Sequence, residues 1–284
     1  MAAAVGSSRA AGAPGWERLW WHSLRLSARW AATLPRHGLA GLKVAVQRAL
    51  VPLDPWRYYE MGRVADDEFS GDCLDVASPK LLASLLRHEG RGRWTATDLF
   101  AAEVEMWRAV DPDLTLEIAD ATRLPYPDAS FDHVLCVSVV EHIPGDGDSA
   151  AMAEFWRVLR PGGVLHMTTD VAPETRDILV DRKVYGEASQ AVEGGVFFAR
   201  NYSPHDLERR LLSVAPWEVE HREFARQRNE ELERRFYARA PWSYLYGLAL
   251  RLRCPDNFDV TRNFPDLTGR KQGVVYLRLR KPRA

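Results

Sequence analysis

From about residue 70 onwards, short apolar segments alternate with segments of helical periodicity, and this alternation is the feature that most constrains the fold. Apolar stretches of strand length occupy five places before residue 175, at 73–77, 93–99, 115–120, 131–140 and 163–171. Helical patterns follow the first, second and fourth of them. Strands that alternate with helices in this way predict a doubly wound, mostly parallel α/β sheet. Two further alternating segments, WEVEHREFA and GVVYLRLRK, bring the sheet to seven strands and suit an antiparallel edge.

The chain divides into regions of different composition. Residues 1–15 are mostly small and flexible, which predicts a disordered leader. Residues 16–53 contain two amphipathic helical stretches and form an N-terminal extension. The α/β domain is expected over 54–284, with a helical insertion at about 227–270 before its last strand.

The composition argues against several classes of protein. A net charge of -1 disfavours a nucleic-acid binder, which is normally basic. The three cysteines lie far apart and form no CxxC pair, so we expect neither a disulfide framework nor a metal site, and a reducing, cytoplasmic location fits. Ala240–Leu250 is the most conspicuous uncharged run, and it is too short to span a bilayer. No apolar segment of the signal-peptide kind follows Met1.

Acidic and polar residues recur where the predicted strands end. Asp75, Asp98 and Asp120 lie at the ends of the first three strands, and Ser138 to His142 lie at the end of the fourth. In a doubly wound sheet, ligands bind outside the carboxyl ends of the strands. Asp98 follows Asp75 at the spacing where a carboxylate accepts both hydroxyls of a ribose. Asp120 can accept a hydrogen bond from an exocyclic amine such as that of adenine.

Longer stretches surround these strand ends: CLDVASPK, TATDLF, IADATRLPYPDASFDHVLCVSVVEHI, EFWRVLRPGGVLHMTTD and FFARNYSPHDLERRL. Together they resemble the class I S-adenosylmethionine-dependent methyltransferases over residues 70–225 and again in the last strand. The resemblance implies a Rossmann-like methyltransferase fold, S-adenosyl-L-methionine as cofactor, and methyl transfer to a small-molecule or lipid-like acceptor. The cofactor-binding residues that it implies are Asp75, Ala77, Ser78, Pro79, Asp98, Leu99, Asp120, Ala121 and Ser138.

The first turn departs from the pattern of that family. Members carry LDxGxGxG there, and the three glycine positions are Ala77, Pro79 and Leu81 in this chain. We expect Ser78 to cap the following helix and Pro79 to be its first residue, so that the helix N-terminus still offers amides to the cofactor's carboxylate. Alanine is tolerable at position 77 if its φ is below zero.

Catalysis in this family requires proximity and alignment, with a base for some acceptors. Glu141 and His142, after the fourth strand, are the candidates for that base. In relatives an equivalent Glu-His pair can instead shape the loop, so a structural role is the alternative. Tyr58, Tyr59 and Asp170 are candidates to line the acceptor pocket.

Two other functions compete with methyl transfer. A dinucleotide oxidoreductase would use the same acid at Asp98, but the glycines that it needs for the pyrophosphate are missing, and it leaves LPYPDASFDHV unexplained. A catalytically inactive methyltransferase-like binding or regulatory protein would explain the lost glycines. The intact Asp98, Asp120 and Glu141-His142 oppose it.

Residues 16–34 combine tryptophan and arginine at helical spacing. One side carries Arg18, His22, Arg25 and Arg29, and the opposite side carries Trp16, Trp20, Leu24, Ala31 and Leu34. Such a helix suits an anionic membrane surface, which would fit a lipid-like acceptor. The alternative is that Trp16, Trp20 and Leu24 pack over the cofactor pocket as a lid while the arginines are solvated. The leader also resembles an organelle transit peptide, an interpretation that ranks below these two.

Overall fold

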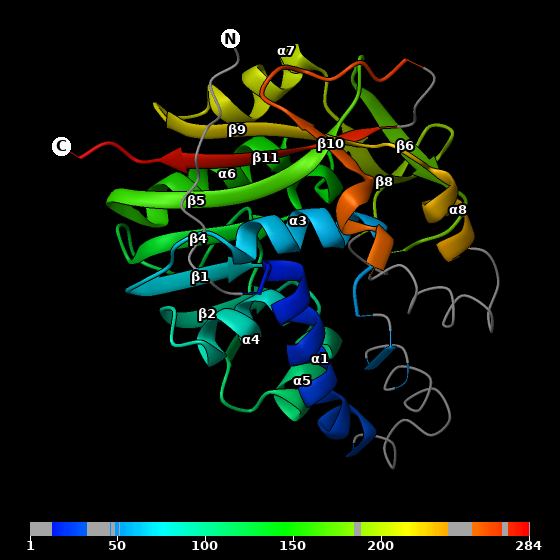
Figure 1. The fold of residues 1–284 in the computed structure, drawn as a ribbon. Coiled ribbons are helices and arrows are strands. Elements are labelled where there is room, and N and C mark those ends of the chain that lie inside the picture. The colour runs from blue at the N-terminus through cyan, green and yellow to red at the C-terminus, as the bar shows by residue number, and fades with distance from the viewer. Residues whose placement is uncertain are drawn as a thin grey trace, which may run out of the picture.

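The fold was obtained as a computed structural model, which describes residues 13–32, 46, 49–50, 52–184, 189–237, 252–268 and 272–283. Its centre is one sheet in the order β10-β9-β11-β5-β4-β1-β2-β3 (Figure 1). The strands of this sheet are β1 Asp72–Val76, β2 Arg93–Asp98, β3 Thr115–Ile118, β4 Phe131–Val137, β5 Leu159–Val171, β9 Glu218–Gln227, β10 Phe258–Thr261 and β11 Gly273–Arg280.

The sheet confirms the expected fold class. Strands β3, β2, β1, β4 and β5 are parallel, and β11 runs antiparallel to both β5 and β9. The expected number of seven strands is too low by one, because β10 pairs antiparallel with β9. Its residues lie within the segment 227–270, which we expected to be helical. The free backbone edge of β9 gives this segment a partner that the sequence pattern alone does not reveal.

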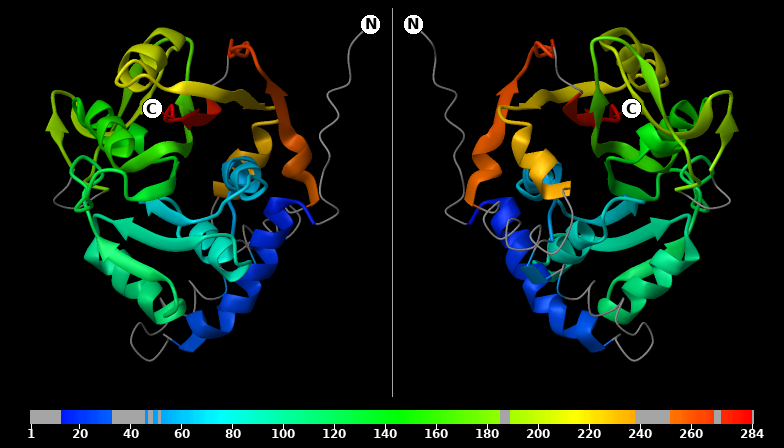
Figure 2. Two further views of the ribbon diagram at one scale, coloured as in Figure 1. Left: turned by 90° about the vertical axis from the view of Figure 1, so that its left-hand side faces the viewer. Right: turned by 90° about the vertical axis from the view of Figure 1, so that its right-hand side faces the viewer.

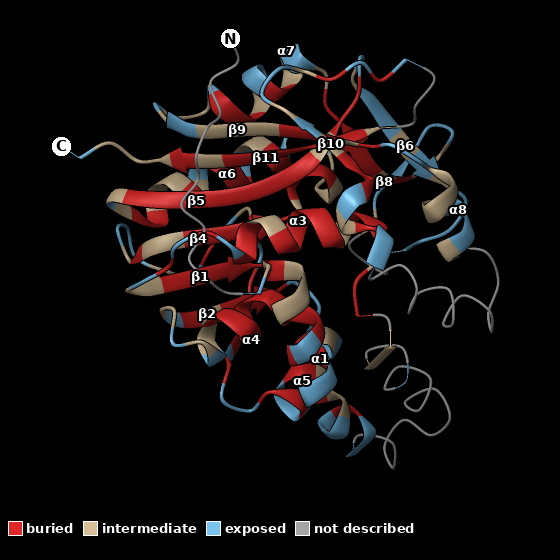
Figure 3. Ribbon diagram, in the orientation of Figure 1, coloured by how far each residue is buried: buried red, intermediate tan, exposed pale blue. Residues whose placement is uncertain are grey.

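Helices cover both faces of the sheet (Figures 1 and 2). One apolar core includes buried side chains of α1, α3, α4 and α5, and a second includes those of α6 and η3. Figure 3 shows that α3 and the central strands are largely buried, whereas exposed residues concentrate on the outer helices. The helices are α1 Gly15–Ala32, α3 Pro55–Ala65, α4 Leu81–His88, α5 Ala101–Val110, η1 Val140–His142, α6 Gly147–Val158, α7 Pro204–Asp206, η3 Leu207–Leu212, α8 Glu231–Tyr237 and η4 Pro255–Asn257.

A second, three-stranded sheet lies beside the carboxyl end of β5. Its strands β6 Arg176–Val180, β7 Ala191–Val192 and β8 Gly195–Asn201 are arranged in the order β6-β8-β7. The sequence analysis did not predict it. Asp148 of α6 anchors this sheet, because its carboxylate accepts hydrogen bonds from Arg200, Arg210 and Tyr202.

The N-terminal helix α1 is part of the folded domain. Its residues Leu19, Leu26 and Trp30 are buried, and the ring of Trp30 meets that of Trp107 of α5 edge-on at 5.4 Å. The arginine stripe is only partly solvated, because Arg18 donates to Glu89 and to the carbonyl of Ala65. Helix α1 therefore packs through a face that contains both apolar and basic residues.

Three expectations for the N-terminal region meet different outcomes. Residues 1–12 of the expected leader lie outside the described residues, and α1 begins at Gly15, one residue earlier than expected. The second helical stretch of 16–53 falls mostly outside them too. Trp20 is buried, but Leu24 is exposed, so Leu24 does not pack as part of a lid. Among the helices of the described ranges, none is long and apolar enough to cross a membrane.

The three cysteines, Cys73, Cys136 and Cys254, are buried as free thiols. Burial raises the pKa of Cys73 and of Cys254 to about 12 and that of Cys136 well above its usual value. At neutral pH these side chains therefore behave as small apolar groups of the core.

Candidate cofactor and acceptor site

The parallel register brings the predicted strand-end residues to one edge of the sheet. Asp75 of β1 lies opposite Ala96 of β2 on one side and Leu135 of β4 on the other. The carboxyl ends of these strands therefore adjoin, and Asp98 ends β2 at the same edge. Asp120 follows β3 in an exposed turn, where its carboxylate accepts from the backbone amide and the hydroxyl of Thr122.

The turn after β1 has a different construction from the one we expected. Ala77 has a φ of +54°, whereas we expected a negative value. Its amide donates to the carbonyl of Thr97 at 2.9 Å, so pairing with β2 holds the alanine in a conformation that favours glycine. The side chain of Ser78 does not cap the helix, because its Oγ accepts from the amide of Val137 at 2.8 Å. This contact ties the turn to the end of β4.

Helix α4 also begins later than expected. Its first residue is Leu81, and the capping position is Lys80, which makes no side-chain cap hydrogen bond. Pro79 therefore precedes the helix and is not its first residue. Because Ser78 is engaged by β4, the chain needs two more residues before it can adopt helical geometry.

Lys80 is the functional residue that the sequence analysis missed. Its ammonium is buried, donates to the carbonyl of Ser78 at 2.7 Å, and lies 3.3 Å from Oδ2 of Asp98 and 3.7 Å from Oδ2 of Asp75. Burial raises the pKa of Asp75 to about 6, and the charge of Lys80 acts against that shift. The sequence does contain a signal for this role of Lys80. The lysine directly follows the turn after β1 and lies between the strand-end residues Asp75 and Asp98 in the sequence.

Glu141 and His142 lie together after β4 but point to different partners. Glu141 is fully buried, and its Oε2 accepts from the hydroxyl of Thr169 at 3.0 Å, while its Oε1 has no hydrogen-bond partner. Nδ1 of His142 lies 2.8 Å from the carbonyl oxygen of Phe198, which can only accept. Nδ1 therefore carries the proton, and Nε2 is the basic nitrogen of the neutral ring.

The three residues expected to line the acceptor pocket, Tyr58, Tyr59 and Asp170, differ in burial and in hydrogen bonding. Tyr58 is buried and its ring lies 6.0 Å from that of Trp16. The hydroxyl of Tyr59 donates to Glu223 at 2.9 Å, and burial together with this carboxylate raises the pKa of Tyr59. Asp170 is only partly buried, at the carboxyl end of β5. Among the three, Asp170 is thus the best placed to meet a ligand.

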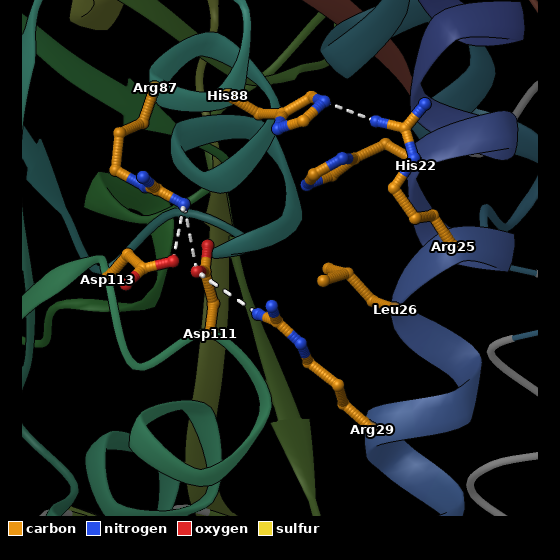
Figure 4. A pocket seen from close by; sticks show the side chains of 8 residues that line it. All are labelled: His22, Arg25, Leu26, Arg29, Arg87, His88, Asp111 and Asp113. Atoms are coloured by element: carbon orange, nitrogen blue, oxygen red, sulfur yellow. Dashed lines mark hydrogen bonds and ion pairs between the residues drawn. The ribbon is translucent and has the colours of Figure 1, made fainter.

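Two cavities in the described ranges lie away from this edge. One, of about 120 Å³, separates α1 from the ends of α4 and α5 (Figure 4). In it, Nε2 of His22 lies 2.8 Å from the hydroxyl of Ser84, which donates to Asp111 at 2.5 Å. The other, of about 240 Å³, adjoins His133 and the loop before the regular part of β5. In the described part of the chain, no group of three or more His, Cys, Asp or Glu could hold a metal ion.

Comparison with known proteins links the central part of this site to one family. Residues 74–167 match the model of a family described as a methyltransferase domain. This segment is therefore similar to methyltransferase domains. It contains β2, β3, β4 and most of β1 and β5, and with them the residues from Asp75 to His142 that line the strand ends.

Individual relatives match over shorter parts of their length. A demethylmenaquinone methyltransferase of Deinococcus radiodurans is 48% identical over 52 residues, which are 18% of this chain and 21% of that protein. A ubiquinone/menaquinone biosynthesis C-methyltransferase of Desulfotalea psychrophila is 27% identical over 128 residues, 44% and 50% of the two chains. The chain thus spans at most about half the length of these relatives. A solved structure of the YcgJ protein from Bacillus subtilis aligns over 80% of this chain and 100% of its own, at 16% identity and a TM-score of 0.49.

One half of the candidate site fits S-adenosylmethionine well. Asp98 presents a carboxylate at the end of β2, and Asp120 is open to solvent after β3. Leu99 and Ile118 are large apolar side chains that are 44% and 53% exposed beside these acids, where a flat base can lie. These groups suit the ribose and the adenine of the cofactor.

The half that would hold the methionine part fits less well. The ammonium of Lys80 lies between Asp75 and Asp98, and the turn at Ala77 carries a methyl group where the family has glycine. Ser138 also has a positive φ, of 55°, and its amide donates to Thr168, which holds the end of β4 in place.

Proposed function

We propose that the protein is an S-adenosylmethionine-dependent methyltransferase that acts on a small-molecule acceptor. The observation that carries this proposal is the position of Asp98 and Asp120, at adjoining strand ends within the segment that matches the methyltransferase domain. The names of the relatives refer to quinones and to a demethylrifamycin, which are small organic acceptors. They support a small-molecule acceptor for this chain as well.

In the proposed reaction the cofactor supplies a methyl group on a sulfonium, which is already electrophilic. The protein's part is to bind and orient the reactants. Asp98 accepts the ribose hydroxyls, Leu99 packs against the base, and Asp120 accepts from its amine. His142 is a candidate base, and its Nδ1 donates to the carbonyl of Phe198, which orients the ring.

Calorimetric titration with S-adenosylmethionine and with its demethylated product tests the proposal directly. The wild-type chain should bind both ligands, and Asp98→Asn should weaken binding by roughly tenfold or more, because it replaces a charged acceptor by a neutral amide. Asp113→Asn is the matched control, since the Asp113 side chain is 67% exposed on the loop that follows α5. If Asp113→Asn weakens binding as much as Asp98→Asn does, Asp98 is not the ribose acid.

A methyltransferase-like protein that binds without turnover is the second candidate. Lys80 between Asp75 and Asp98, together with the loss of three glycines, favours it. It predicts that the cofactor binds to the wild-type chain and that no methyl group is transferred to any acceptor. Transfer to any acceptor would exclude it.

We propose a cytoplasmic location, which the three free buried thiols support. A membrane contact through residues 16–34, and with it a lipid-like acceptor, would rely on Trp21 and Leu24, which are 51% and 36% exposed. Trp20 and Trp30 are buried and cannot reach lipid without unfolding. Sedimentation with anionic liposomes, compared between the intact chain and Trp21→Ala, tests this contact. Equal sedimentation of the intact chain and the Trp21→Ala variant would contradict a membrane contact through this helix.

A further inference from the structure

The cavity between α1 and the ends of α4 and α5 carries an excess of positive charge (Figure 4). Arg25 and Arg29 of α1 and Arg87 of α4 line it, together with Asp111 and Asp113 from the end of α5 and the loop after it. Three guanidinium groups thus face two carboxylates, which leaves one positive charge in excess when the histidines of the lining are neutral. An anion is therefore the ligand that the charge of this cavity favours.

The cavity has a buried floor and an open rim. His22 and Asp111 are 4% and 1% exposed, whereas Arg25 and Arg29 lie exposed at the surface. A ligand can thus enter from solvent between the arginines and reach the buried groups. The volume of about 120 Å³ accommodates several water molecules and is well below that of pockets for drug-sized ligands, so a small ion fits best.

The hydrogen bonds of the floor fix the tautomer of His22. The hydroxyl of Ser84 donates its one proton to Asp111 at 2.5 Å, because a carboxylate can only accept. The Oγ of Ser84 must then accept from Nε2 of His22, which is 2.8 Å away. Burial is the largest of the causes that lower the pKa of His22 to about 4, so the ring is neutral at pH 7. Nδ1 of His22 therefore carries a lone pair and no proton.

Two buried polar atoms beside the cavity have no hydrogen-bond partner among the residues that the structure describes: Nδ1 of His22 and Nε of Arg87. Nδ1 of His22 can only accept a hydrogen bond, and Nε of Arg87 can only donate one. Such atoms are uncommon in folded proteins, because each costs the free energy of its desolvation. A single ligand that both donates and accepts would satisfy the two of them.

Asp111 holds these two side chains near each other. Its Oδ2 accepts from Ser84, which His22 contacts, and its Oδ1 accepts from Arg87 at 3.0 Å. Ser84 and Arg87 lie three positions apart on α4 and so share one face of the helix. His22 and Arg87 therefore flank a single carboxylate at the floor of the cavity.

The arginines at the rim have further donors for an anion. Nη1 of Arg29 lies 3.3 Å from the carbonyl oxygen of Val110 and 3.9 Å from Asp111, so this guanidinium reaches toward the floor (Figure 4). Nη1 of Arg25 contacts His88. In the described part of the chain these contacts use only Nη1, which leaves Nε and Nη2 of both arginines able to donate to a ligand.

We propose that this cavity binds hydrogen phosphate, with the hydroxyl of the ion on Nδ1 of His22 and its charged oxygens on Arg87 and Arg29. At neutral pH inorganic phosphate keeps at least one proton, so it can donate and accept at the same time. Sulfate has the same shape and no proton, and a phosphate monoester, whose second pKa is about 6, has mostly lost its own. The bound ion joins α1 to α4 and to the end of α5. Because this cavity lies away from the strand ends, the inference is independent of the proposed methyltransferase function.

Calorimetric titration of the full-length chain with phosphate and with sulfate, at pH 7 and equal ionic strength, tests the inference. Phosphate should bind at least roughly tenfold more tightly, because sulfate would leave Nδ1 of His22 facing an oxygen lone pair. Arg29→Gln should weaken phosphate binding by roughly tenfold, because it removes a charge-assisted hydrogen bond. Arg209→Gln is the matched control, since this side chain is 57% exposed on η3 and pairs with Asp206, and it should leave the affinity unchanged.

His22→Asn separates recognition of the proton from attraction by charge. The amide of asparagine can turn either its oxygen or its NH₂ group toward a ligand, so phosphate and sulfate should bind to this variant with affinities within about threefold of each other. Equal binding of the two ions to the wild type, or a phosphate affinity that Arg29→Gln leaves unchanged, would overturn the proposal. Binding of neither ion would also overturn it, since water alone would then satisfy the two buried atoms. Because Arg29 is exposed, Arg29→Gln keeps the test valid even if His22→Asn fails to fold.

Discussion

Lys80 has an ammonium between two carboxylates that the cofactor would otherwise approach. It is buried, and it lies within 3.3 Å of Asp98 and 3.7 Å of Asp75. A ligand that binds the carboxylate of Asp98 must compete with this ion pair. We therefore propose that Lys80 lowers the affinity of the site for its ligand.

We expect Lys80→Met to bind S-adenosylmethionine more tightly than the wild type. Removal of the ammonium frees Asp98 for the ribose hydroxyls, and the gain should be on the order of tenfold, about 1.4 kcal/mol. Lys80→Arg, which keeps the charge, is the control and should not gain affinity. Calorimetry measures both. Weaker binding by the Met variant would mean that the ammonium contacts the ligand itself.

Ala77 is the residue whose backbone departs most from our expectation. Its φ of +54° is costly for an L-amino acid and free for glycine. We expect Ala77→Gly to raise the free energy of unfolding by roughly 1 kcal/mol. Ala28→Gly, at an exposed position inside α1, should lower it by about 1 kcal/mol. Urea denaturation distinguishes the two signs, and a loss of stability in both variants would contradict the account.

The sequence predicts some of these residues and misplaces others for a physical reason. Asp98 and Asp120 are found because they end strands, and the end of a strand is a local property. The role of Ser78 is set by Val137, 59 positions away, and that contact depends on how β1 and β4 pair. The bridge between Val171 and Tyr202 cannot be predicted for the same reason, because it joins β5 to a residue 31 positions away.

Helix α1 depends on a buried histidine for its attachment. His22 is 4% exposed, and burial, followed by the positive charge of His88, lowers its pKa to about 4. Asp111 and Glu89 act in the opposite sense, and Arg25 in the same sense. The folded state thus prefers the neutral ring, so this contribution to stability is complete above pH 6.5 and is lost as the pH falls toward 4.

A pH series of denaturation measures this contribution. Between pH 7 and pH 5 the wild type should lose about 2 kcal/mol through His22, at 1.36 kcal/mol for each unit of pKa difference. His22→Asn should not show this part of the loss. His205→Asn is the control, because the side chain of His205 is 82% exposed, and it should retain the wild-type slope. Identical slopes for wild type and His22→Asn would show that protonation of His22 does not limit stability.

At the scale of elements, the sequence analysis predicted the buried strands correctly. It missed several strands that lie at the edges of sheets. Strands β1, β2, β4 and β5 follow the apolar segments of the sequence, because most of their residues are buried. Strand β3 also follows one, although it lies at an edge of the sheet. Strand β10 and the sheet of β6, β7 and β8 lie at edges and carry many exposed residues. Their formation is decided by partners distant in sequence, which a local pattern does not encode.

At the scale of the molecule, Asp148 joins three parts of the fold. It lies at the start of α6, is fully buried, and accepts from Arg210, Arg200 and Tyr202, which belong to η3, β8 and the strand extension after it. Removal of its charge would leave two arginines without their shared partner. The second sheet would then lose one of its polar attachments to the domain.

We expect Asp148→Asn to lower the free energy of unfolding by about 3 kcal/mol, as for other buried charge networks that lose one member. Asp146→Asn is a close control, since Asp146 contacts the same Arg210 at 3.1 Å but its side chain is 91% exposed. That variant should change stability by less than about 1 kcal/mol. Thermal and urea unfolding give both values. Similar losses in the two variants would show that burial of Asp148 is not what matters.

The three buried thiols can report on local opening of the protein. Because Cys73, Cys136 and Cys254 lie in the core and their pKa values are raised, a thiol reagent can react only after the surrounding structure opens. Cys73 reports on β1, Cys136 on β4, and Cys254 on the segment before β10. The order in which a thiol reagent alkylates the three cysteines would therefore reveal which of these segments opens first. No engineered cysteine is needed for the measurement.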